Sequence, residues 1–323
     1  MRITNKMLSN NFLRDMRTNL NNLSTIQNQM ASGKQIRKPS DDPAKASKIM
    51  QMYSDIDANT QYNSNIKNTS NWLDTTDKVL GQIGDVTTRI QELLVSVNGT
   101  FGPNERAAVK DEINQKVGEL SQMLNTSFDG KYIFGGTRGT TKPTETSKVG
   151  DNTQLGFAKI GGGELDLTNA ADSIEYNQIN SSLLVEVSQG VTMEYNVTAT
   201  EVVNYGTGDN NLSKLLENIT SHLSSTATAD DISALSGDDL KGIQDFSTNV
   251  LKLRSQVGSK QNTMESAQTR NDENNLNMTE ILSATEDIDI TEKAMEYATM
   301  QTIYLASLQT SAKVIQPSLL DYL

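Results

Sequence analysis

The chain has 323 residues, of which 35% are hydrophobic and 5% aromatic, with a formal net charge of −12 and a mean hydropathy of −0.50. So few core-forming residues are unusual for a large compact enzyme, and the acidic balance argues against a nucleic-acid partner. The absence of cysteine excludes a disulfide framework and thiol chemistry, and no stretch is apolar enough for a membrane span.

An amphipathic helix is predicted near the start of the chain. Spacings of three and four residues connect Leu13, Met16, Leu20, Leu23, Gln27 and Met30. Gly33 suits the position after the end of this helix. Asp42 followed by Pro43 then predicts a new helix start, with Asp as the N-cap and Pro as the first helical residue. We interpret Asp41 and Asp42 as capping residues in preference to metal ligands.

The next segments predict two helices that fold back on each other. A period of seven residues continues to about Val97 and includes Ile66, Leu73, Leu80, Thr87 and Leu94. Asn98-Gly99 and Gly102-Pro103 break the pattern. A further helix is predicted over 104–126, and the two helices should form an antiparallel hairpin.

The pattern then changes to that of short strands. Asp129-Gly130 predicts a β-hairpin turn within 128–137, followed by a strand over 131–134. From 140 to 205, glycine-containing turns alternate with predicted strands over 183–188, 191–198 and 200–204. The sequence therefore predicts a β-rich insertion in a mainly helical protein.

Helices return after the insertion. A short helix is predicted over 212–223, a polar connection over 230–239, and a long helix over 238–278. In the long helix the apolar residues follow three- and four-residue spacings: Ile243, Phe246, Val250, Leu253 and Val257. Because the terminal helices enclose the inner helices, and these enclose the insertion, the predicted layout is nested.

The last 47 residues predict a second terminal helix with a heptad pattern. Its apolar stripe contains Ala294, Ala298, Gln301, Leu305, Leu308, Ala312, Ile315 and Leu319. The two ends also differ in charge. Residues 1–40 have seven basic side chains against one acidic, whereas residues 281–323 have six acidic against two basic. We therefore expect the two terminal helices to pair.

Residues that could support catalysis are scarce. His222 is the one histidine and lies in a polar helix, which disfavours zinc sites and a Ser-His-Asp triad. No phosphate-binding glycine motif is present, and the acidic residues 286–289 lack the spacing of a calcium loop. We expect no enzymatic activity, no metal and no cofactor. Paired carboxylates in 140–205 remain open, although no pair stands out.

Association is the remaining interpretation. With about eight stripe residues per helix, pairing of the two terminal helices alone would be marginal against the cost of ordering them. We infer that they order fully when several copies assemble. The alternative is that each stripe simply packs within the chain.

Four separated segments resemble bacterial flagellins and, more closely, the flagellin-like subunits that join hook to filament. They are MRITNKM at the start, SGKQIRKPSDDPA over 32–44 with Pro39, Ser40, Asp41, Asp42 and Pro43, FDGKYIFGGT over 128–137, and the end from Ala306 to Leu323. No motif of 140–205 matches. The resemblance implies a structural protein of the bacterial flagellum, at the extracellular hook–filament junction, exported unfolded without a cleavable signal peptide.

The resemblance also implies a domain plan and partners. Residues 1–40 and 279–323 would form a terminal assembly domain, 41–139 and 206–278 an inner helical domain, and 140–205 an outer β-rich domain. Other copies, a neighbouring hook-associated junction protein, flagellin and an export chaperone bound at the C-terminal region are the implied partners. Two alternatives stay open: flagellin itself, or a secreted binding module or hydrolase that acts through 140–205.

Overall fold

The computed structural model describes residues 5–97, 101–166, 168–205, 210–224 and 226–314. It divides into two compact units: unit 1 contains Met1–Asn59 and Glu273–Leu323, and unit 2 contains Thr60–Asp272. Two long helices, α2 (Pro43–Ser96) and α8 (Leu240–Glu286), contribute residues to both units. The predicted fold class is confirmed, because long helices dominate and the strands form small hairpins. The predicted three-part domain division stays a proposal.

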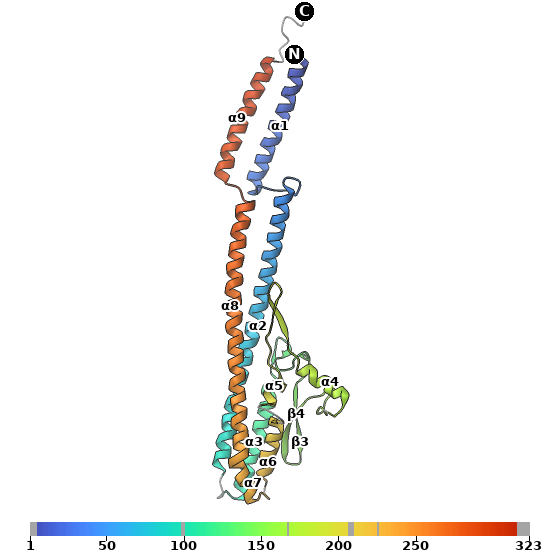
Figure 1. The fold of residues 1–323 in the computed structure, drawn as a ribbon, viewed down its shortest axis with the longest axis vertical. Coiled ribbons are helices and arrows are strands. Elements are labelled where there is room, and N and C mark those ends of the chain that lie inside the picture. The colour runs from blue at the N-terminus through green and yellow to red at the C-terminus, as the bar shows by residue number, and fades with distance from the viewer. Residues whose placement is uncertain (1–4, 98–100, 167, 206–209, 225, 315–323) are drawn as a thin grey trace, which may run out of the picture. The chain divides into compact units, whose positions relative to one another are not determined.

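In unit 1, helices α1 (Asn5–Ser32) and α9 (Ile290–Val314) lie side by side (Figure 1). Gly33 follows α1 with φ +72°, the left-handed conformation that glycine adopts without strain at a helix end. The Oδ1 atom of Asp42 accepts hydrogen bonds from the backbone N–H groups of Ala44 and Lys45, each at 3.1 Å. The predicted helix end and helix start are therefore both confirmed.

Helices α2, α3 (Pro103–Leu124) and α8 contribute the largest share of the core of unit 2. The residues of the predicted seven-residue period on α2 are buried: Ile66, Leu73, Leu80, Thr87 and Leu94. Thr87 fits this apolar stripe because its hydroxyl donates to the carbonyl of Ile83 at 2.7 Å. Ion pairs from Arg89 to Glu112 and from Arg254 to Asp77 connect α2 to α3 and α8 to α2.

Three antiparallel two-stranded hairpins make up the described β-structure. β1 (Ser127–Phe128) pairs with β2 (Lys131–Tyr132), β3 (Thr144–Val149) with β4 (Asn152–Phe157), and β5 (Leu184–Ser188) with β6 (Val191–Glu194). Asp129 and Gly130 connect β1 to β2 with φ values of 50° and 74°, as the predicted two-residue hairpin turn requires. The strand after this turn ends at Tyr132, earlier than predicted.

Within the insertion, one predicted strand was wrong and one helix was missed. The predicted strand over 200–204 is instead helix α5 (Ala199–Val203), which begins with a capping box in which Thr198 and Glu201 hydrogen-bond to each other's backbone N–H groups. The insertion also contains an unpredicted helix, α4 (Ala170–Ile179), capped by Asn169. Polar capping residues mark the start of both helices. A search for apolar periodicity does not detect such short capped helices.

The chain after the insertion is also more helical than predicted. The predicted short helix is α6 (Leu212–His222), but the expected polar connection over 230–239 is helix α7 (Ala229–Ala234) followed by a π-helical turn, η1 (Leu235–Asp239). α8 continues to Glu286, beyond the predicted end, and α9 starts only after Asp289. Asp289 caps α9, because it accepts from the N–H groups of Thr291 and Glu292 and these bonds lower the pKa of its carboxyl.

Candidate assembly surface

The α1–α9 pair of unit 1 carries most of the residues that the sequence assigned to assembly. On α1, exposure is reduced at three- and four-residue spacings, at Ser9, Phe12, Met16, Asn19, Leu23, Ile26 and Met30. On α9 the same pattern is seen at Lys293, Tyr297, Met300, Tyr304 and Ser307. Because heptad spacing keeps one face of each helix toward its neighbour, we assign these residues to the contact face of the pair.

The structure separates the predicted assembly residues into two groups. Met16, Leu23 and Met30 lie on the contact face. The other group is exposed, and we call it the outer stripe: Leu13, Leu20, Ala298, Leu305 and Leu308. On α9 the outer stripe lies one residue further along the chain than the contact face at every step. Ala312 belongs to α9, and Ile315 and Leu319 fall outside the described residues.

The outer stripe leaves large apolar side chains in water. Leu13 is 51% exposed, Leu305 54% and Leu308 41%. Removing a leucine side chain from water contributes about 1.5–3 kcal/mol, so a second apolar surface would bind here favourably. Within the α1–α9 pair only Ile26 is fully buried among the residues with a described side chain. The pair therefore has more apolar surface than it buries by itself.

A polar cluster joins the linker that follows α1 to the end of α8, just before α9, and the sequence analysis did not identify it. The Nζ atom of Lys34 lies 2.5 Å from Oε1 of Glu286, and the hydroxyl of Tyr53 donates to Oε2 of Glu286 at 2.7 Å. We call these three residues the linker cluster. The carboxylate of Glu286 is 9% exposed, and its hydrogen bond with Lys34 raises the pKa of that amine. The cluster is an ion pair between the basic and acidic ends of the chain.

Backbone hydrogen bonds reinforce the same place. The N–H of Gln35 donates to the carbonyl of Glu286 at 2.6 Å, and the N–H of Ile288 donates to the carbonyl of Gly33 at 3.1 Å. The two linkers are thus paired like short antiparallel strands. The available sequence signals were a lysine next to a helix-ending glycine and a glutamate in the acidic C-terminal part of the chain.

The motif Pro39, Ser40, Asp41, Asp42, Pro43 forms the turn before α2. Asp41 Oδ2 accepts from the N–H groups of Arg37 and Lys38 at 3.3 and 3.0 Å, and Asp42 caps α2. Both carboxylates therefore stabilise backbone: Asp42 caps α2 as interpreted, whereas Asp41 stabilises the turn before that helix. Among the described residues, no group of three or more His, Cys, Asp or Glu side chains could hold a metal ion.

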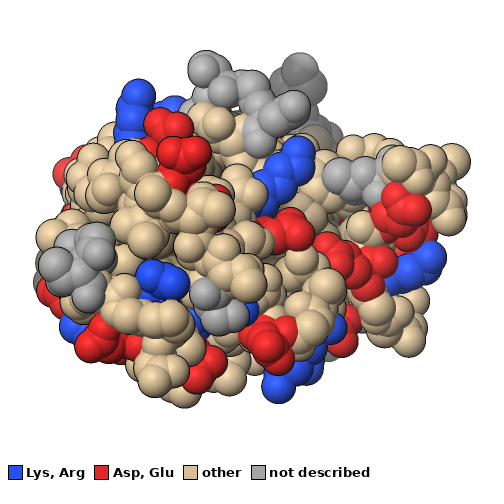
Figure 2. Space-filling model, turned by 90° about the horizontal axis from the view of Figure 1, so that it is seen from below, with Lys and Arg blue, Asp and Glu red and all other residues tan. Residues whose placement is uncertain are grey.

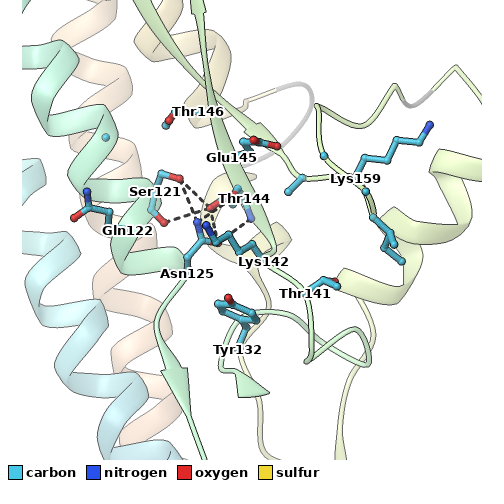
Figure 3. A pocket seen from close by; sticks show the side chains of 15 residues that line it. Ser121, Gln122, Asn125, Tyr132, Thr141, Lys142, Thr144, Glu145, Thr146 and Lys159 are labelled. Atoms are coloured by element: carbon cyan, nitrogen blue, oxygen red, sulfur yellow. Dashed lines mark hydrogen bonds between the residues drawn. The ribbon is translucent and has the colours of Figure 1, made fainter. Parts of the chain in front are cut away.

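A cavity of about 600 Å³ in unit 2 lies beside the β3–β4 hairpin (Figure 3). Ser121 of α3 and Asn125, the residue after that helix, hydrogen-bond to Thr144 of β3 in its wall. Among its described lining residues Glu145 is the one carboxylate, beside Lys142 and Lys159. The cavity therefore does not bring together the pair of carboxylates that acid–base hydrolysis would need.

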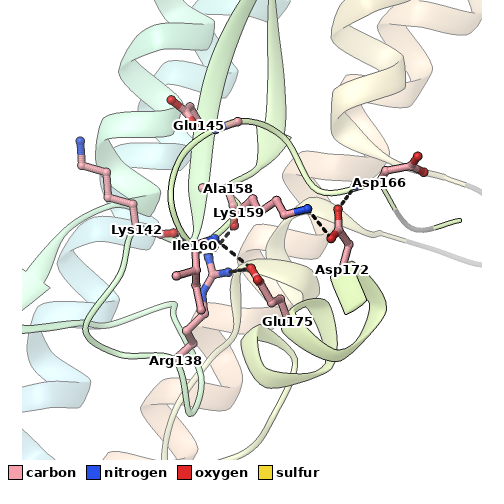
Figure 4. Close-up of polar contacts among 10 residues, drawn as sticks. Arg138, Lys142, Glu145, Ala158, Lys159, Ile160, Asp166, Asp172 and Glu175 are labelled. Carbon is pink, nitrogen blue, oxygen red and sulfur yellow. Dashed lines mark hydrogen bonds and ion pairs between the residues drawn. The ribbon is translucent and has the colours of Figure 1, made fainter. Parts of the chain in front are cut away.

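Ion pairs hold the carboxylates near this cavity (Figure 4). Arg138 lies 2.9 Å from Glu175 and donates to the carbonyls of Lys142 and Ala158. Lys159 lies 2.7 Å from Asp172 and lowers the pKa of that carboxyl. A carboxyl with a lowered pKa is a poor general acid near neutral pH. We therefore assign these ion pairs a structural role, in which they hold α4 against the hairpin region.

The side chain of His222 connects two helical segments of unit 2. Its Nδ1 lies 2.6 Å from Oδ2 of Asp239, the buried end of η1, and so connects α6 to that turn. Burial raises the pKa of Asp239.

Figure 2 shows acidic and basic side chains scattered over the face seen from below, with no continuous patch of either sign. None of the described helices is sufficiently long and apolar to cross a membrane.

Comparison with known proteins identifies the family. The model of the bacterial flagellin N-terminal helical region matches residues 3–138, and that of the C-terminal helical region matches 240–323, together more than half of the chain. Flagellar hook-associated protein 3 of Escherichia coli K12 is 24% identical over 311 residues, which cover 95% of each chain. A flagellin of Clostridium tyrobutyricum is 29% identical over 140 residues, which cover 43% of this chain and 37% of that protein.

A solved structure shows the same fold. A flagellar hook-associated protein of Vibrio parahaemolyticus superimposes with a TM-score of 0.61 at 20% identity, over 76% of this chain and all of the other. The resemblance inferred from four short segments thus extends along almost the whole sequence. The chain belongs to the flagellin family of flagellar structural proteins, and within that family it matches flagellar hook-associated protein 3 from end to end.

Proposed function

We propose that this chain is the structural, non-enzymatic subunit of the junction between flagellar hook and filament. Copies assemble through α1 and α9, and the assembly is the platform on which flagellin polymerises. The observation that carries the proposal is the outer stripe, which stays exposed after α1 and α9 have paired. The full-length match to hook-associated protein 3, against a partial match to flagellin, favours the junction over the filament.

The arrangement of α9 explains why assembly would need several copies. One apolar face is used against α1, and the adjacent face, with Leu305 and Leu308, is free within the unit. A helix that is apolar on more than one side is stable when it is surrounded by other helices. We propose that neighbouring copies supply those helices.

Other partners and the location follow from the same proposal. The chain is exported to the outside of the cell, contacts a hook-associated protein on one side and flagellin on the other, and is bound before export by a chaperone at its C-terminal region. The exposed apolar side chains of α9 are the surface that such a chaperone would protect.

Deletion of the gene tests the junction role. The expected result is cells with hooks but without filaments, which release flagellin into the medium, and restoration of filaments by the wild-type gene. Flagellin itself is the second candidate, because the family fold is shared. Thousands of copies per purified filament, measured by quantitative mass spectrometry, would establish that candidate and exclude a junction role.

A further inference from the structure

The turn before α2 and the first turns of that helix carry a group of basic side chains, which we call the basic patch: Arg37, Lys38, Lys45 and Lys48. All four are exposed. Their described hydrogen-bond partners are neutral amides, since Arg37 donates to Asn28 at 3.2 Å and Lys45 to Gln35 at 3.5 Å. In the described part of the chain none of the four forms an ion pair with a carboxylate.

The position of the patch is unfavourable within the chain. The hydrogen bonds of Asp41 and Asp42 go to backbone N–H groups, and the first turn of α2 contains no acidic residue. Lys45 lies in that first turn, where the partial positive charge of the helix N-terminus disfavours a cation. Asp41 and Asp42 balance only part of the charge of the four cations, and an acidic partner outside the chain would balance the rest.

The surface at the patch is concave and partly apolar. A hollow of about 540 Å³ is lined by three cations, Arg37, Lys38 and Lys45, by the carboxylates of Asp41 and Asp42, and by the last turns of α1. Pro39, Pro43, Ala46 and Met50 line a second hollow of about 400 Å³, and Met50 is 66% exposed. Exposed apolar side chains close in sequence to charged ones offer more contact area than a small anion requires and suit a protein partner.

A complementary surface exists on the same chain. Glu273 and Glu280 are exposed on α8, seven residues apart and so on one face, about 10 Å apart along the helix. Within the described residues neither carboxylate has an ion-pair partner. The patch is basic in a chain of net charge −12, so the most abundant acidic surface it meets is that of another copy.

We propose that the basic patch of one copy receives Glu273 and Glu280 on α8 of a second copy. This contact rests on the proposed self-assembly and adds to it a specific pairing of two different surfaces. In the head-to-tail arrangement that we propose, each copy gives its basic patch to one neighbour and its Glu273 and Glu280 to the other. Such a contact continues from copy to copy until a ring closes.

Cysteine pairing tests the contact directly, because the natural chain contains no cysteine. Lys38→Cys and Glu280→Cys chains are expressed together in the deletion strain, flagella are isolated and oxidised, and linked peptides are identified by mass spectrometry. The expected product links residue 38 of one variant to residue 280 of the other. Links between two copies of the same variant, or no link at all in flagella that contain both variants, would overturn the proposal.

Charge reversal gives an independent test by filament formation. Arg37→Glu with Lys38→Glu should reduce the number of filaments at least tenfold, and so should Glu273→Lys with Glu280→Lys. The chain that combines all four substitutions should recover filaments, because every contact then has both charges reversed. Failure of the combined chain to recover, although circular dichroism shows it folded, would contradict the pairing.

A matched control separates the patch from the effect of net charge. Lys67 and Lys78 are exposed on the part of α2 in unit 2, and Lys67→Glu with Lys78→Glu makes the same change in charge. This control should assemble normally. If wild-type chains restore filaments but no 38–280 link forms, the proposed function stands and the contact is refuted. If wild-type chains are not found in isolated flagella, the proposed function itself fails.

Discussion

Glu286 shows how a single side chain can hold two distant parts of the sequence together. Its carboxylate is nearly buried and receives both the amine of Lys34 and the hydroxyl of Tyr53. A buried carboxylate is stable only when it is paired in this way. The residue therefore fixes where the chain leaves α1 and where it enters α9.

Glu286→Ala should loosen the linkers without unfolding unit 2. Lys34 and Tyr53 are each more than one third exposed and can be rehydrated, so the expected loss is about 1 kcal/mol of local stability. Amide exchange of Gln35 and Ile288, whose N–H groups pair the linkers, should accelerate about fivefold. Glu265→Ala, at an exposed site in unit 2, is the control, and equal acceleration in both variants would argue against the role of Glu286.

At the scale of the element, α9 is the helix whose two faces have different roles. Tyr297, Met300 and Tyr304 face α1, whereas Ala298, Leu305 and Leu308 are exposed. Substitution on the exposed face should therefore spare the isolated chain and impair the assembly. A surface that packs within the chain would, by contrast, destabilise the isolated chain when it is substituted.

Leu305→Glu with Leu308→Glu should abolish filaments while the thermal unfolding midpoint of the monomer changes by less than about 2 °C. The physical reason is that these side chains are already in water in the single chain, so charge is costly only where another copy would cover them. Electron microscopy and calorimetry provide the two readouts. Leu251→Glu, at a leucine that is 61% exposed in unit 2, is the matched control. Normal filaments from the Leu305/Leu308 variant would exclude the outer stripe from assembly.

At the scale of the whole molecule, the two units differ in how much apolar surface they bury. The core of unit 2 is continuous over three long helices, α6 and the hairpins. The described core of unit 1 is a small cluster of Ile49, Met52 and Leu282, with two further buried apolar residues, Ile26 on α1 and Ala46 on α2. Opening of the terminal pair should thus occur far more readily than opening of the helical core.

Hydrogen exchange of the isolated chain tests this difference. Amides of α1 and α9 should exchange at least 100-fold faster than those of α2 between Ile66 and Leu94, and should become protected in assembled flagella. Equal protection of both regions in the monomer would show that the α1–α9 pair is stable by itself. Assembly would then not be coupled to ordering of these helices.

The sequence by itself determined the helical fold class, the end of α1 at Gly33, the cap at Asp42 and the hairpin turn at Asp129-Gly130. Each depends on residues within one turn of each other or on a repeated apolar spacing, and such information is local. Short capped helices such as α4 and α5 were missed, because their side-chain caps carry the signal and apolar periodicity is weak over so few turns.

Only the tertiary structure decided which face of α9 meets α1. The contact face and the outer stripe of this helix are offset by one residue along the chain, and both contain apolar side chains. Heptad spacing in the sequence is therefore compatible with either face packing against α1. The chain just before α9 is held by contacts of Glu286 with Lys34 and Tyr53, which lie 252 and 233 positions away in sequence. Contacts between residues so distant in sequence form only when the chain folds. The exposure of the outer stripe could therefore be recognised only in the tertiary structure.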